Sequence, residues 1–218
     1  MIAYHACYVV VMFGLSGIEL YSGFWWAFPR VTAAGFVSVS GWNLAAKRAR
    51  GAGFSAFAKR AGMLGLVALA ISVATWPVLG QGFVFFGVIH LLALSSVLAY
   101  PLLGRPWYAM LAGVACVVAG LALGTPRFDV AWLAWLGLRP SGLHPADYLP
   151  LAPWFAFVAF GSAARDFVRT KRRYPRPQKA PTAPVRILAA TGRHSLVVYL
   201  AHLPLLYAAG WILAVLVP

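Results

Sequence analysis

Long apolar runs, separated by short polar or basic segments, fill most of this chain. Seven runs are predicted to form helices, at residues 1–19, 24–44, 61–79, 83–103, 107–124, 148–165 and 192–216. A helix needs about 20 predominantly apolar residues to cross the hydrocarbon core of a bilayer. The runs are continuous, whereas a transmembrane β-barrel shows segments of about ten residues that alternate apolar and polar positions. The pattern therefore predicts an all-α, polytopic transmembrane helical bundle with about seven spans.

The composition agrees with a membrane protein. Hydrophobic residues make up 62% of the 218 positions and charged residues only 10%, whereas a soluble domain carries about 25% charged residues. Most of the surface is therefore expected to face membrane lipids. No internal repeat and no soluble domain is visible, so residues 1–218 are interpreted as a single transmembrane domain. Cys7 and Cys116 lie inside apolar runs and are interpreted as small buried side chains rather than a disulfide.

The net charge of +14 is explained by membrane topology, so no nucleic-acid partner is predicted. Five Lys and Arg residues lie in the 47–60 loop, one is Arg105, and eight lie in the 165–187 loop. The loops between these segments carry only Arg127 and Arg139. Because cytoplasmic loops are enriched in Lys and Arg, the basic loops are predicted to be cytoplasmic and residues 125–147 to face outside.

Two of the loops carry further signals. In the outer loop, Phe128, Trp132 and Trp135 have helical spacing and predict a short helix that lies on the membrane surface. The 165–187 loop combines its cations with four prolines and predicts an extended linker. The same loop offers charge for anionic lipid or for the phosphates of a nucleotide-like cosubstrate, although topology already accounts for that charge.

Three histidines lie inside apolar runs: His5, His90 and His202. Ionisable residues at membrane depth usually face a bundle interior or a water-filled cavity, so we expect His90 and His202 to have polar partners there. Two interpretations stay open for each ring, a neutral imidazole satisfied by a carbonyl or hydroxyl group, and a group that takes part in chemistry. No pair has the spacing of a helix-borne metal site, and the thiols are not beside the imidazoles, so no metal is predicted.

A polar stripe is predicted on the last run. At 100° per residue, Ser195, Tyr199 and His202 fall within about 60° of one another. About 10 Å of helical rise separates Ser195 from His202, which excludes a serine nucleophile paired with this base. Arg193 and His194 precede the stripe and are placed at the inner interface, where an Arg side chain extends its charge toward water.

Asp147 lies at the outer end of the sixth run, in "HPADYLPLAPWF". The more ordinary role for this residue is the N-cap of that helix, with Pro150 in its first turn. The alternative is a carboxylate at the entrance of a cavity.

Three segments resemble a known family when they are taken together and in order: "FGVIHLLALSSVLAYPLL", "DYLPLAPWFAFVAFG" and "GRHSLVVYLAHLPLL". They are similar to the bacterial relatives of the heparan-α-glucosaminide N-acetyltransferase catalytic domain, over nearly the whole chain. The resemblance implies an integral membrane acyltransferase of the bacterial cytoplasmic membrane. Such a protein takes an acyl group from cytoplasmic acyl-CoA, such as acetyl-CoA, and passes it to an acceptor across the membrane. The acceptor stays open, as a small molecule or a glycan such as a sugar.

The resemblance also assigns roles to residues. Tyr4 and His5 match a Tyr-His pair in the first helix of the family. His5 is the first candidate for the base that acyl transfer needs, His90 is the second, and His202 is an inner partner or orienting group.

The same resemblance indicates where substrates bind. Acyl-CoA is expected at the inner face, near Arg193, His194 and the basic loops. Ser195, Tyr199 and Asp147 are expected to line the cavity or its entrance.

The start of the chain departs from the family pattern. The family has an acidic residue followed by Arg-Gly before its first helix, and an Asp four residues after the histidine, where this chain has Val9. If the first helix ends near Phe13, about 13 residues remain, which is shorter than a span. We therefore interpret the first span as truncated and expect an upstream segment that carries the acidic residue and Arg-Gly.

Two other classes of protein stay open at this point. One is a transporter or permease-like protein whose histidines line a solute path, although the paired, Gly/Pro-interrupted segments of many transporters are not seen. The other is a non-catalytic membrane protein, either a structural subunit or a degraded relative of the enzymes. The oligomeric state is not predicted.

Overall fold

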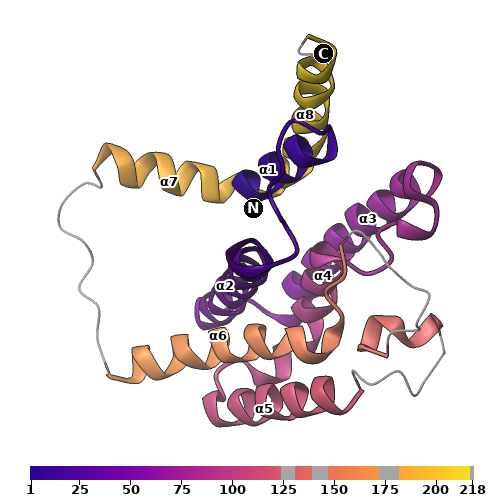
Figure 1. Cartoon of the computed structure of the whole chain (residues 1–218). Coiled ribbons are helices and arrows are strands. Elements are labelled where there is room, and N and C mark those ends of the chain that lie inside the picture. The colour runs from indigo at the N-terminus through magenta and orange to yellow at the C-terminus, as the bar shows by residue number, and fades with distance from the viewer. Residues whose placement is uncertain (124–130, 139–146, 172–181, 217–218) are drawn as a thin grey trace. The chain divides into compact units, whose positions relative to one another are not determined.

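The computed structural model describes residues 1–123, 131–138, 147–171 and 182–216, and every regular element in this part of the chain is helical (Figure 1). The α-helices are α1 (Ile2–Met12), α2 (Gly23–Ala49), α3 (Phe54–Leu79), α4 (Val88–Leu98), α5 (Pro106–Leu123), α6 (Leu151–Lys171), α7 (Ala183–Arg193) and α8 (Ser195–Leu216). Three short 3-10 helices are η1 (Gly80–Gly82), η2 (Tyr100–Leu102) and η3 (Ala131–Leu136). The all-α prediction is confirmed for the described residues.

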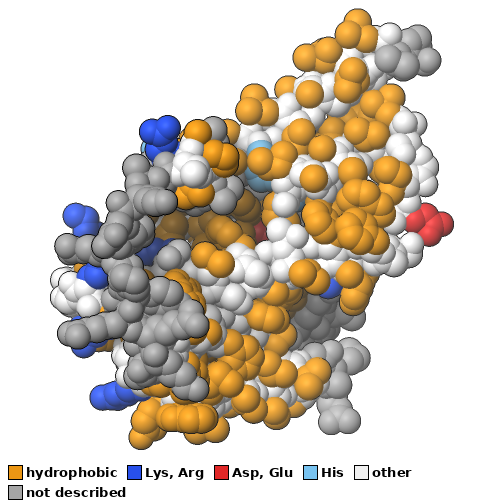
Figure 2. Space-filling model, turned by 90° about the vertical axis from the view of Figure 1, so that its left-hand side faces the viewer, with side chains coloured by type: hydrophobic (Ala, Val, Ile, Leu, Met, Phe, Trp, Pro, Cys, Tyr) orange, Lys and Arg blue, Asp and Glu red, His pale blue; other side chains and the backbone are white. Residues whose placement is uncertain are grey.

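Two segments are long and apolar enough to cross a membrane, Phe54–Gly82, which comprises α3 and η1, and Ser195–Leu216, which is α8. Only 11% of the most apolar window of each is buried, so these helices turn apolar side chains outward, as lipid-facing helices do. Figure 2 shows apolar side chains over much of one face of the molecule. Membrane location is supported, but the prediction of about seven spans is not confirmed.

Several predicted runs differ from the helices that form. The first run ends early, because α1 stops at Met12. In the fourth run, residues 83–87 are not helical, and Phe86 forms an isolated β-bridge with Tyr148, so that α4 has only 11 residues. The amide of Leu149 donates to the carbonyl of Phe86 at 3.0 Å. An apolar run by itself does not distinguish such an extended segment from a helix.

The two loop predictions are partly corrected. Trp132 and Trp135 lie in η3, a 3-10 helix, while Phe128 lies outside the described residues. The basic loop is shorter than predicted, because α6 continues to Lys171 and α7 begins at Ala183. The predicted linker between them lies outside the described residues.

The chain divides into two compact units, residues 1–33 with 174–218, and residues 34–173. In the first unit α1 packs against α8. In the second unit α3 packs against α4, and α5 lies beside α6 (Figure 1).

Glycines allow a close crossing of α2 and α6 in the second unit. A Cβ added at Gly41 would lie 2.0 Å from the carbonyl oxygen of Val158, and one added at Gly161 would lie 2.0 Å from the carbonyl oxygen of Ser38. Lipid supplies no hydrophobic force between helices, so small residues that let two backbones touch are a main source of their association. The two glycines therefore fix where these helices cross.

We expect Gly41→Ala to destabilise the protein by about 1–3 kcal/mol, because its methyl group would overlap the backbone of α6. Gly35→Ala in the same helix is the matched control, since a Cβ there meets nothing within 4 Å. Its stability should stay within about 1 kcal/mol of the parent protein. Thermal unfolding of both variants in the same detergent checks this, and equal midpoints for the two would show that the crossing is not tight.

Candidate functional site

Two histidines from opposite ends of the sequence form a direct pair in the first unit. The Nδ1 atom of His5, on α1, lies 2.8 Å from the Nε2 atom of His202, on α8. The ring centres are 4.9 Å apart, and His202 is only 6% exposed. The sequence indicated both residues separately, and the structure brings them together.

Hydrogen bonds to the backbone determine which nitrogen carries the proton. The Nδ1 atom of His202 lies 2.7 Å from the carbonyl oxygen of Tyr199 and 3.2 Å from that of Val198. A carbonyl oxygen only accepts, so this nitrogen carries the hydrogen and the Nε2 atom of a neutral His202 must accept from His5. His5 then donates through Nδ1 and keeps the lone pair on its own Nε2.

The Nε2 atom of His5 is the chemically available atom of the pair. No hydrogen bond joins it to another residue in the described part of the chain. An imidazole nitrogen with a free lone pair is able to take a proton or to attack a carbonyl carbon.

Glycine also allows the close packing of α1 on α8. A Cβ added at Gly210 would lie 2.3 Å from the Cγ1 atom of Val9 and 2.8 Å from the Cδ2 atom of Phe13. Val9 is 2% exposed. Val9, where the resemblance led us to expect an Asp, is therefore a packing residue in the contact between α1 and α8.

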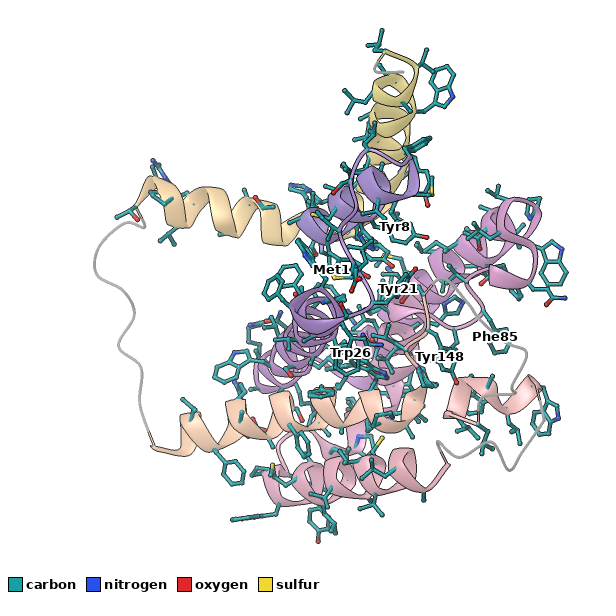
Figure 3. The ribbon with its side chains drawn as sticks, in the orientation of Figure 1. Met1, Tyr8, Tyr21, Trp26, Phe85 and Tyr148 are labelled. Carbon is teal, nitrogen blue, oxygen red and sulfur yellow. The ribbon has the colours of Figure 1, made fainter. Side chains whose placement is uncertain are left out.

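The rings of Tyr4 and Tyr199 lie beside the pair. The Tyr4 ring lies 5.8 Å from the His5 ring and 6.4 Å from Trp25, and the Tyr199 ring lies 5.7 Å from His202. Figure 3 shows the side chains of α1, with Tyr8 labelled, and those at the beginning of α2, with Trp26 labelled.

His90 has a different environment, in the second unit. The amide of Gly87 donates to its Nδ1 at 3.2 Å, and its Nε2 lies 3.1 Å from the Oγ atom of Ser72. The Ser72 hydroxyl donates to the carbonyl of Val84 at 2.7 Å, so it accepts from His90. Nδ1 therefore caps the beginning of α4, and Nε2 joins α4 to α3. This geometry supports the structural interpretation of His90.

Asp147 caps a helix, but not the predicted one. Its Oδ2 atom accepts from the amide of Val88 at 2.9 Å, at the N-terminus of α4, whereas α6 begins only at Leu151. The first amide groups of a helix have no hydrogen-bond partner within the helix, which explains why the Asp147 carboxylate binds the amide of Val88. Gly87 makes room, because a Cβ there would lie 2.1 Å from the same carboxylate oxygen. The expected N-cap role on its own helix is wrong.

The other predicted residues do not gather at the pair. Ser195 is exposed at the beginning of α8, while Tyr199 is half-buried and contributes its carbonyl. The predicted stripe is therefore buried only at its far end. His194 is exposed between α7 and α8, about 12 Å of helical rise from His202. Arg193 ends α7, and its side chain is outside what the structure describes.

One charged residue of α2, Arg30, was not among the predicted functional residues. Arg30 lies about 10 Å along α2 from Gly23, within the predicted second span. Its guanidinium lies 4.0 Å from the ring centre of Trp26, and its Nη1 donates to the carbonyl of the same residue at 2.6 Å. A charge inside an apolar run was the signal that would have identified it.

Two shallow recesses lie elsewhere. One of about 250 Å³ is lined by Ser72, Val73, Trp76 and Phe83. The other, of about 340 Å³, follows the end of α1 and includes Val11, Glu19 and Tyr21. His5 and His202 line neither, so the cavity expected around the stripe stays a prediction.

Comparison with known proteins identifies one family. The family model described as heparan-alpha-glucosaminide N-acetyltransferase, catalytic, matches residues 1–204, which confirms the resemblance found from the three segments. No curated protein and no solved structure matches the chain.

We expect ¹⁵N NMR of histidine-labelled protein at neutral pH to show hydrogen on Nδ1 and a lone pair on Nε2 for both His5 and His202. The reason is the chain of hydrogen bonds that ends on the carbonyl of Tyr199. The exposed His194 is the internal control and should not be confined to this tautomer. A hydrogen on Nε2 of neutral His202 would contradict the assigned direction of the pair.

Proposed function

Because the chain belongs to the heparan-alpha-glucosaminide N-acetyltransferase catalytic family, we propose that it is a membrane acyltransferase whose reacting group is His5, supported by His202. The donor in this proposal is acetyl-CoA or another acyl-CoA, and the acceptor is a hydroxyl or amine of a small molecule or sugar. The observation that carries the proposal is the free lone pair on Nε2 of His5, in a ring that His202 holds through its other nitrogen.

The chemistry follows from that nitrogen. As the acceptor oxygen or nitrogen attacks the thioester carbonyl, Nε2 of His5 takes the proton that the acceptor loses. The new carbon–oxygen or carbon–nitrogen bond forms, the carbon–sulfur bond breaks, and the proton passes to the departing CoA sulfur. In the variant route, Nε2 itself attacks the thioester carbonyl, the carbon–sulfur bond breaks and CoA leaves as its thiolate. The acceptor then attacks the acyl carbon, the carbon–nitrogen bond to His5 breaks, and the proton that the acceptor loses passes to the CoA thiolate. In both routes His202 orients His5 and stabilises the positive charge that develops on its ring.

The topology of the proposal has seven spans and one catalytic domain over residues 1–218. The basic loops 47–60 and 165–187 face the cytoplasm of a bacterial inner membrane, which places Arg193 and His194 on the side where acyl-CoA is available. Support comes from the distribution of Lys and Arg along the sequence and from the two apolar helices.

We expect His5→Gln to lower the rate of acyl transfer by about 100-fold or more, which is the usual size of a general-base contribution. CoA release from acetyl-CoA by protein in liposomes, with a panel of amino sugars as acceptors, measures that rate. Gly35→Ala, where an added Cβ meets nothing within 4 Å, should keep the parent rate. Parent activity in His5→Gln would remove this residue from the mechanism, and solute flux without CoA release would favour a transporter.

Single-cysteine labelling checks the orientation in intact cells. Ser55→Cys should be protected from a reagent that does not cross the membrane, whereas Ser141→Cys should react, because positive loops stay inside. A background variant with Cys7 and Cys116 replaced by Ala is the control. Labelling of Ser55→Cys from outside would reverse the topology.

A further inference from the structure

Three cations gather where α2 ends and α3 begins, in the second unit. The Nζ atom of Lys47 donates to the carbonyl of Ala56 at 2.9 Å and lies 5.2 Å from the ring centre of Phe57. The Nη1 atom of Arg48 donates to the carbonyl of Ala52 at 3.2 Å, and its guanidinium lies 4.8 Å from the ring centre of Tyr100.

The third cation, Arg60, lies one turn beyond Ala56 and Phe57 on α3. It is half-buried, and its Nη1 donates to the hydroxyl of Ser96 on α4 and lies 3.5 Å from the carbonyl of Leu92. Tyr100 follows Ser96 by one turn of the chain, and its ring packs 5.1 Å from that of Phe57. The packed rings of Phe57 and Tyr100 therefore connect Lys47 and Arg48, which lie against them, while Arg60 binds α4 one turn before Tyr100.

No carboxylate neutralises these three cations in the described part of the chain. The ion pair found there joins Arg165 to Asp166 at 2.8 Å, and Asp166 also accepts from the amide of Gly104. Asp147 binds the opposite end of α4, at Val88. Carbonyl, hydroxyl and aromatic groups contact these three cations. The N–H groups of Arg48 and Arg60 that make none of these contacts are therefore available to bind an anion.

Topology alone does not require this arrangement. Arg50 and Lys59 are exposed cations of the same loop, and they satisfy the positive-inside rule wherever their side chains point. Lys47, Arg48 and Arg60 differ from these two in their contacts: although Arg48 is also exposed, each of the three donates a hydrogen bond, and Lys47 and Arg48 also lie against aromatic rings. Guanidinium groups recognise phosphate by paired hydrogen bonds, and fixing them in advance lowers the entropic cost of binding.

We propose that the corner formed by Lys47, Arg48 and Arg60, named here the α2–α3 corner, binds a phosphate group. The phosphate is either that of an anionic lipid headgroup or that of a soluble nucleotide. The proposal does not depend on acyl transfer, because binding is measured without turnover.

The test compares two double variants of the full-length protein in detergent. Arg48→Gln with Arg60→Gln removes two charges from the α2–α3 corner, and Arg50→Gln with Lys59→Gln removes two exposed charges from the same loop. The probes are adenosine 3′,5′-bisphosphate, followed by the shift in unfolding temperature, and phosphatidylglycerol, followed by its retention against phosphatidylcholine in native mass spectrometry. We expect the first variant to bind the preferred probe about tenfold more weakly and the second to bind it nearly as the parent does.

The possible outcomes distinguish a nucleotide phosphate from a lipid headgroup, and they include a result that overturns the proposal. Binding of the bisphosphate that depends on Arg48 and Arg60 indicates a nucleotide, and the same dependence for phosphatidylglycerol indicates a headgroup. If Arg60→Gln does not fold, Lys47→Gln with Arg48→Gln leaves the contacts of Arg60 to α4 intact and should show the same loss. Equal weakening in the corner and control variants, or no binding of either probe by the parent protein, overturns the proposal.

Discussion

Close packing at glycines, against a helix backbone or against side chains, is the constraint on which the rest of this structure depends. Helices surrounded by lipid gain little from burying apolar side chains against each other, so they associate where backbones and small side chains fit closely. Gly41 and Gly161 provide this fit between α2 and α6, and Gly210 provides it between α8 and α1. The second contact has a chemical consequence, because it places His5 within hydrogen-bonding distance of His202.

Polar groups within or next to the apolar helices are used in two different ways. His90, Ser72 and Asp147 direct their hydrogen-bonding atoms to backbone amides and carbonyls around the beginning of α4. These hydrogen bonds offset the free-energy cost of burying the polar groups and fix the local fold. The histidine pair is different, since one of its four ring nitrogens keeps a lone pair with no described partner. That difference is the physical basis for placing the proposed chemistry at His5 rather than at His90.

The sequence predicted the helical class and the membrane environment, and it identified three histidines within apolar runs, because each depends on composition or on local periodicity. It did not predict the contacts between distant segments. Nothing in the local pattern shows that His5 meets a residue 197 positions away, or that Asp147 caps α4 instead of α6. Residues 83–87 were predicted to be helical because an extended apolar segment has the same local composition as a helix. The cations of the α2–α3 corner were interpreted only as a signal of membrane topology. The sequence does not show that Phe57 and Tyr100, which contact two of them, pack against each other.

The central claim is that His202 acts through His5, and steady-state kinetics of His202 variants test it most directly. His202→Leu removes the acceptor for the Nδ1 hydrogen of His5, whereas His202→Gln retains an oxygen that is able to accept it. The account predicts that His202→Leu lowers kcat about tenfold or more with little change in the KM for acyl-CoA, and that His202→Gln recovers part of the loss. Parent kcat in a folded His202→Leu protein would contradict the account.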